Sequence, residues 1–109
     1  MQRHFRIFGL VAFACGLAAA ASAQPPRVST FEAGVYIDFG FSFLDYQNIE
    51  SAERCRDLCL QDRRCRVWRY IAGTAPADYG TARRLCVLGD RGPLSRTRPG
   101  SWAISGQVR

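Results

Sequence analysis

Four cysteines in the second half of the chain are the residues whose spacing most clearly implies chemistry: Cys55, Cys59, Cys65 and Cys86. Four cysteines form either two disulfide bonds or a tetrahedral zinc site. Zinc ribbons use pairs of cysteines with two residues between them, whereas these cysteines are separated by three, five and twenty residues. An even number of cysteines is typical of disulfides in a short exported chain. We therefore expect two disulfide bonds, no metal site and no other cofactor.

The pairing of these cysteines follows in part from their neighbours. Cys55 and Cys59 lie four residues apart on a predicted helix, where their Cα–Cβ vectors are nearly parallel and suit a disulfide badly. Two of the three possible connectivities remain. Cys65 lies just beyond the helix end, within reach of Cys59 by a tight turn, and Cys86 lies on a later predicted strand. We predict Cys59–Cys65 and Cys55–Cys86.

The basic residues are the second set with chemical potential, because all 15 of them are arginine. The chain has no lysine, and its single histidine, His4, lies in the N-terminal segment. Without that segment, the composition excludes Ser-His-Asp and Cys-His catalysis, lysine Schiff bases, P-loop phosphate binding and histidine metal ligands. Acids such as Glu53 and Asp57 lie on the predicted helix surface, in a domain with little room for a glycosidase cleft. We expect a binding protein rather than an enzyme.

The candidate ligand-binding residues are arginines after the predicted helix and in later segments, together with one tryptophan: Arg63, Arg64, Arg66, Arg69, Arg83, Arg84 and Trp102. These arginines form either a patch for an anionic polymer or simply the solvated surface of the domain. Trp68 and Tyr70 are interpreted as core residues rather than as a sugar-stacking platform, because aromatic side chains dominate small cores. Nucleic acid is not an expected partner of an exported domain.

The N-terminal 23 residues have the features of a secretory signal peptide. Arg3 and Arg6 precede an uncharged apolar or small-residue run over 7–21, and Ala21-Ser22-Ala23 is typical of a cleavage site. Cleavage there would leave a net charge of +4 on residues 24–109. The alternative is an uncleaved membrane anchor, which would be the protein's one contact with a membrane. We expect a secreted or periplasmic protein.

The rest of the chain divides into a flexible leader over residues 24–30, which contains Pro25-Pro26, and one domain over residues 31–109. Apolar residues alternate in several segments, and Ser51 is a good N-cap for a helix. Gly34 and Gly40 indicate bends. The predicted elements are one or two strands over 35–43, a helix from Ser51 to about Asp62, strands over 66–72, 85–88 and 102–108, and loops over 73–81 and 89–100.

The stretch from Ser51 to Tyr70 resembles the core of a PAN/apple domain. That family has a helix with Cys-x3-Cys, then a cysteine before an aromatic-x-aromatic strand, a later Cys-x-Leu strand and a terminal Ser-Gly. The matching residues here include Trp68 and Tyr70, then Cys86-Val87-Leu88, then Ser105-Gly106. The resemblance implies an α+β fold with about five antiparallel strands curved around one helix. It also implies the same two disulfides.

The resemblance further implies a noncatalytic module that binds a protein or carbohydrate ligand. Two features depart from the family. The extra bridge that joins the termini of many apple domains is absent, and Gly89 stands where a lysine often follows Cys-x-Leu. A lysine-mediated ligand contact is therefore not expected. The alternative function is that of an envelope-associated structural protein that holds anionic polymers through an arginine-rich surface.

Overall fold

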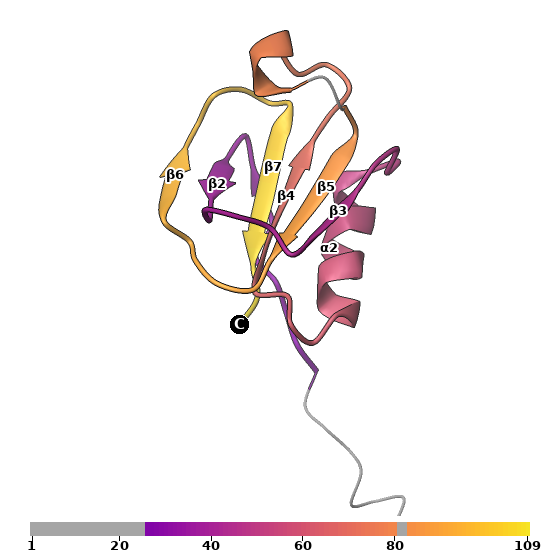
Figure 1. Cartoon of the computed structure of the whole chain (residues 1–109), viewed down its shortest axis with the longest axis vertical. Coiled ribbons are helices and arrows are strands. Elements are labelled where there is room, and N and C mark those ends of the chain that lie inside the picture. The colour runs from indigo at the N-terminus through magenta and orange to yellow at the C-terminus, as the bar shows by residue number, and fades with distance from the viewer. Residues whose placement is uncertain (1–25, 81–82) are drawn as a thin grey trace, which may run out of the picture.

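A computed structural model describes residues 26–80 and 83–109, and its centre is an antiparallel five-stranded sheet (Figure 1). The signal peptide expected over residues 1–23 lies outside the described residues. The helices and strands are β1 (Glu32–Ala33), β2 (Tyr36–Asp38), β3 (Leu44–Tyr46), α2 (Ala52–Gln61), β4 (Val67–Ile71), the 3-10 helix η1 (Ala77–Tyr79), β5 (Leu85–Gly89), β6 (Ser95–Thr97) and β7 (Ala103–Gln107).

The sheet has the strand order β1-β7-β4-β5-β3, and β2 and β6 form a separate two-stranded ribbon. Figure 1 shows α2 and this ribbon on opposite sides of the sheet. The expected α+β fold with one helix and a five-stranded antiparallel sheet is confirmed. None of the helices among the described residues has the length and apolar character that a bilayer span requires.

Helix α2 begins where the sequence predicts. The Oγ of Ser51 accepts a hydrogen bond from the backbone N–H of Arg54 at 3.1 Å, so it satisfies one of the free donors of the first turn. The helix ends at Gln61, one residue before the expected end. Its buried side chains are Ala52, Cys55 and Cys59, which form one stripe against the sheet.

Strand β4 lies at the centre of the sheet and sends alternate side chains to its two faces. Trp68 and Tyr70 face α2 and are 0% and 5% exposed, so their interpretation as core residues is confirmed. Val67 faces the other way and packs with Ile37 and Phe39 under the β2–β6 ribbon. The ribbon therefore completes a second, smaller core on the face of the sheet that the helix leaves open.

The ribbon differs from the sequence prediction. Only residues 36–38 of the predicted 35–43 strand region pair as a strand, because Gly40 turns the chain with a φ of 85° and Phe41 is exposed. The next strand, β3, begins at Leu44. Strand β6 lies within the expected loop over 89–100. Its three residues are all exposed, so they carry no apolar alternation that would predict a strand.

The described part of the expected flexible leader, residues 26–30, is docked against the end of β7. Ser29 forms an isolated bridge with Val108, and the N–H of Thr30 donates to the Gln107 carbonyl at 3.0 Å. Gly106 allows this approach, because a Cβ there would overlap both the Thr30 carbonyl oxygen and the Trp68 indole. The leader therefore adds to the sheet edge instead of remaining free.

Candidate functional site

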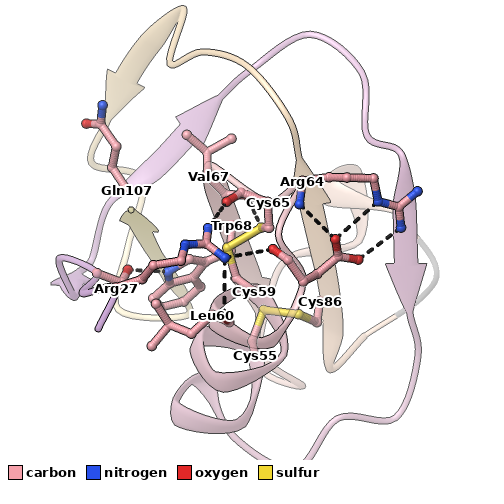
Figure 2. The surroundings of a disulfide bond; sticks show 12 residues. Arg27, Cys55, Cys59, Leu60, Arg64, Cys65, Val67, Trp68, Cys86 and Gln107 are labelled. Carbon is pink, nitrogen blue, oxygen red and sulfur yellow. Dashed lines mark hydrogen bonds and ion pairs between the residues drawn. A yellow bond between two sulfur atoms is a disulfide. The ribbon is translucent and has the colours of Figure 1, made fainter. Parts of the chain in front are cut away.

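Two disulfides connect α2 to its surroundings, and the pairings are those expected from the cysteine spacing. Cys55 bonds to Cys86 on β5 with a Cα–Cα distance of 5.5 Å, and Cys59 bonds to Cys65 with 5.2 Å (Figure 2). All four cysteines are fully buried. The first bond ties the helix to the sheet. The second closes the turn after the helix, which carries several of the candidate arginines.

The C-terminus of α2 is held by Arg27, a residue of the leader. Its guanidinium donates to the carbonyl oxygens of Leu60 at 3.2 Å, of Asp62 at 2.9 Å, and of Cys65 (Figure 2). The last carbonyls of a helix lack intrahelical partners and form its negative end, so a cation is stabilising there. Sequence reasoning missed Arg27, because nothing in a short proline-containing segment indicates that it docks on a distant helix.

Arg27 also lines an open surface pocket of about 610 Å³ at this end of the molecule. We call it the arginine pocket. Four of its lining residues are arginines and none is acidic; the full set is Arg27, Leu60, Gln61, Arg63, Arg66, Val108 and Arg109. The N–H of Val108 donates to the Arg66 carbonyl at 2.8 Å, which places Arg109 beside Arg66. No local sequence pattern marks Arg109, because it meets Arg66 only through the pairing of β7 with β4.

The electrostatics of the pocket depend on which arginines are already paired. Arg63 and Arg66 are exposed and, within 26–80 and 83–109, neither forms an ion pair. Arg64 instead binds Asp62 through both carboxylate oxygens, at 3.1 and 2.9 Å, and lies 4.4 Å over the Phe43 ring. This hydrogen bond is the main cause of the lowered pKa of Asp62. Arg64 therefore lies away from the pocket with its charge compensated.

Arg69 lies on the other face of the sheet and serves the second core. Its guanidinium lies 4.5 Å from the centre of the Tyr36 ring and 4.8 Å from that of Phe39. It donates to the Ile37 carbonyl at 2.8 Å. Burial lowers its pKa, and its Nε has no hydrogen-bond partner among the described residues. This arrangement attaches β2 to the main sheet, so the structure separates Arg69 from the arginine pocket.

Arg83 and Arg84 lie at the opposite end of the sheet. Arg66 precedes Val67, which pairs with Gly89, whereas Arg84 precedes Leu85 at the other end of the same strand pair. Arg83 donates to the Gly73 carbonyl at 3.2 Å, and Arg84 donates to the Ile49 carbonyl at 3.3 Å. The predicted arginines therefore do not form one patch, and only Arg63 and Arg66 of that set line the pocket.

Trp102 is half-buried and belongs to a row of three aromatic rings, which we call the aromatic cluster: Tyr36, Tyr79 and Trp102. The centres of the Tyr79 and Trp102 rings are 4.3 Å apart, and those of Tyr36 and Tyr79 are 5.6 Å apart. The Trp102 indole lies over Gly100, where a Cβ would come within 2.6 Å of its Nε1. Tyr36 and Tyr79 were not predicted as site residues, because their segments meet Trp102 only in the folded chain.

Comparison with known proteins identifies the fold. A family model described as PAN domain matches residues 32–88, which include all four disulfide cysteines, the helix, strands β1 to β4 and all of β5 except Gly89. A search of curated proteins found no match. PAN domains are typically noncatalytic modules that bind proteins or carbohydrates. Because the match covers more than half of the chain and agrees with its disulfides and its fold, this chain belongs to the PAN domain family.

Proposed function

We propose that this protein is an exported, noncatalytic binding module that recognises a protein or carbohydrate ligand through acidic groups held in the arginine pocket. The observation that carries the proposal is the set of four arginines around one open pocket without an acidic lining residue. Export is supported by the two disulfides, which persist in oxidising compartments. The expected signal peptide supports it as well.

The pocket combines a fixed cation with free ones. Arg27 is held by three carbonyl groups, so it forms a rigid wall. Arg63 and Arg66 are exposed and have planar guanidinium groups that bind carboxylate, sulfate or phosphate oxygens in pairs. A ligand that brings two or more acidic groups would replace water around several of these cations together. Such charge-assisted hydrogen bonds are the strong class of polar contact.

A noncatalytic role agrees with the chemistry of the described residues. The four cysteines of residues 26–109 are all consumed in disulfides, so none supplies a nucleophilic thiolate. The pocket itself offers guanidinium, amide and aliphatic groups, which bind and orient a ligand but do not exchange protons near neutral pH.

The second candidate function is the structural holding of anionic polymers by the whole arginine surface. The observation that favours it is the distribution of exposed arginines over both ends of the sheet, with Arg63 at one end and Arg84 at the other. Such a surface binds through its general field, so every exposed arginine contributes to a similar extent. Binding in the arginine pocket instead predicts that Arg63 and Arg66 contribute more to affinity than the other exposed arginines.

The experiment compares two double variants that remove the same charge. Arg63→Gln/Arg66→Gln alters the pocket, and Arg83→Gln/Arg84→Gln alters the far end of the sheet. The probes are a polyuronate, its neutral methyl ester and a polyglutamate peptide, measured by titration calorimetry. We expect the acidic probes to bind to the unaltered protein. Their affinity for Arg63→Gln/Arg66→Gln should be lower by about tenfold or more, which corresponds to about 1.4 kcal/mol.

Each result decides between the candidates. The far-end variant should retain affinity within about threefold, or under 1 kcal/mol. Equal losses in both variants, with a steep decrease as salt rises, would favour the holding of anionic polymers. Binding of the neutral ester as tightly as the polyuronate, or no binding of either acidic probe, would overturn an acidic ligand in the pocket.

A further inference from the structure

The aromatic cluster is a second surface feature that the arginine pocket does not explain. Tyr36 comes from β2, Tyr79 from η1 and Trp102 from the residue before β7, so three distant segments supply one ring each. Tyr79 is 38% exposed, and the other two rings are half-buried. Ile71 pairs with Ala103 at the same end of the sheet, remote from Arg66. In Figure 1, η1 and the C-terminus lie at opposite ends of the molecule.

The polar ends of these rings distinguish the cluster from the core aromatics. In the core, the Tyr70 hydroxyl donates to the Ile49 carbonyl and the Trp68 indole N–H donates to the Ser29 hydroxyl, both at 2.7 Å. Within 26–80 and 83–109, neither tyrosine hydroxyl of the cluster nor the Trp102 Nε1 has a hydrogen-bond partner. Aromatic rings with a polar end are the side chains most often used as binding anchors.

The tilt of the rings indicates the shape of the ligand. Tyr36 and Tyr79 are inclined at 64° to each other, and Tyr79 and Trp102 at 57°. A sugar stacks the C–H face of its chair-shaped ring on one broad aromatic plane, whereas rings inclined at 64° and 57° offer no common plane. A polyproline II peptide suits such inclined rings, because its proline rings are wedges and its carbonyl groups are free to accept hydrogen bonds.

The charges beside the cluster indicate the flanking residues of that peptide. Arg98 directly follows Thr97, which pairs with Tyr36. Arg83 donates to the carbonyl of Gly73, two residues after β4 ends, and the N–H of the neighbouring Ala72 donates to the Trp102 carbonyl. Both arginines are exposed, and one acid, Asp78, lies beside Tyr79. We propose that the aromatic cluster binds a proline-rich, extended protein segment with acidic flanking residues. This site is independent of the arginine pocket and shares no residue with it.

The test uses a synthetic peptide of about nine prolines, three polyproline turns, with glutamates at both ends. The control peptide has the same length and charge but replaces the prolines with alternating glycine and serine. Titration calorimetry with the full mature chain should show that the proline peptide binds at least about tenfold more tightly than the control peptide, whose glutamates contact only the arginine pocket. Tyr79→Ala should weaken binding of the proline peptide by about tenfold or more. Tyr79→Phe, which removes only the hydroxyl, should give a smaller loss. Since η1 contributes no buried residue, neither change threatens the fold.

Phe41→Ala is the matched control, because Phe41 is an aromatic residue with 69% exposure that lies outside the cluster. The affinity of Phe41→Ala for the proline peptide should equal that of the unaltered protein. The proposal is overturned if no saturable binding of the proline peptide occurs, if Tyr79→Ala and Phe41→Ala weaken it equally, or if the pocket variant abolishes it. It is also overturned if Tyr79→Ala abolishes binding of a neutral oligosaccharide but not of the peptide.

Discussion

Ser105 holds Ile37 across the interface between the two β-layers: the backbone N–H of Ile37 donates to the Ser105 Oγ at 3.1 Å. The same hydroxyl donates to the Val35 carbonyl at 2.7 Å. On the other side of Ile37, its carbonyl accepts from Arg69. Side chains of β7 and β4 therefore satisfy backbone groups in β2 and in the residue just before it, and they fix the ribbon over the second core.

Ser105→Ala should destabilise the protein by about 2–3 kcal/mol, because it leaves a buried N–H and a buried carbonyl without partners. Ser105 is 0% exposed, so water does not reach these groups. Urea unfolding measures the difference. Ser95→Ala, on the exposed strand β6, is the control and should stay within about 0.5 kcal/mol of the unaltered protein. Equal values for the two variants would show that the hydroxyl of Ser105 does not hold the ribbon.

Arg27→Gln should reduce stability by about 1–2 kcal/mol, because three carbonyl groups at the end of α2 lose a charged donor that is partly exposed. Hydrogen exchange should accelerate at the amide groups of Asp62 and Cys65, which form the turn that Arg27 holds. Arg98→Gln removes the same charge from an exposed loop position and serves as the control. Unchanged exchange in Arg27→Gln would contradict a capping role.

Stability should depend on the protonation of Asp62 at acid pH. The hydrogen bond from Arg64 is the largest cause that lowers the pKa of Asp62 below its ordinary value of 3.8, against the opposing effect of desolvation. A lowered folded-state pKa contributes stability that is present above the unfolded pKa and is lost as pH falls through the folded pKa. The unaltered protein should therefore have a higher Tm than Asp62→Asn near pH 7.

That difference in Tm should shrink as pH falls below the usual carboxyl range of about 4 and disappear once Asp62 is protonated. Asp90→Asn is a suitable control, because within the described part of the chain Asp90 forms only an exposed ion pair with its neighbour Arg91. A difference between the unaltered protein and Asp62→Asn that stayed constant down to the most acid pH would contradict this assignment.

The two disulfides should contribute unequally. Their sequence separations are 31 for Cys55–Cys86 and 6 for Cys59–Cys65. Loop-closure entropy predicts losses of about 3.7 and 2.4 kcal/mol for the corresponding double alanine variants. Urea unfolding of each double variant checks both values. A larger loss for Cys59→Ala/Cys65→Ala would show that the turn after the helix, rather than the entropy of the unfolded chain, governs the effect.

Local sequence signals predicted the parts of the fold that depend on neighbours in the chain. Ser51 caps the helix because its hydroxyl reaches an N–H three residues later, and this needs no distant partner. The cysteine pairings could be predicted for the same reason. The spacing within the helix disfavours a Cys55–Cys59 bond, and the nearby helix end favours a Cys59–Cys65 bond. Trp68 and Tyr70 could be assigned to the core because alternate residues of a strand share one face.

Long-range contacts account for what the sequence did not predict. Strand β6 carries no apolar alternation, and its pairing with β2 depends on a ribbon that Ser105 and Arg69 attach from other strands. The docking of the leader depends on Gly106, whose missing side chain leaves room for Thr30. Neither the pairing of β6 with β2 nor the docking of the leader is indicated by a local sequence pattern.

The sequence by itself determined the family, the helix, the cysteine framework and the arginine-only basic chemistry, because these follow from residue type and short spacing. Only the tertiary structure decided which arginines act together. Arg27 and Arg109 meet Arg63 and Arg66 because residues 27–30 lie beside the segment that ends β7, whereas Arg69 is held between aromatic rings on the opposite face. The sequence does not distinguish one arginine from another. The strand register and the helix end near each arginine determine which groups its side chain contacts.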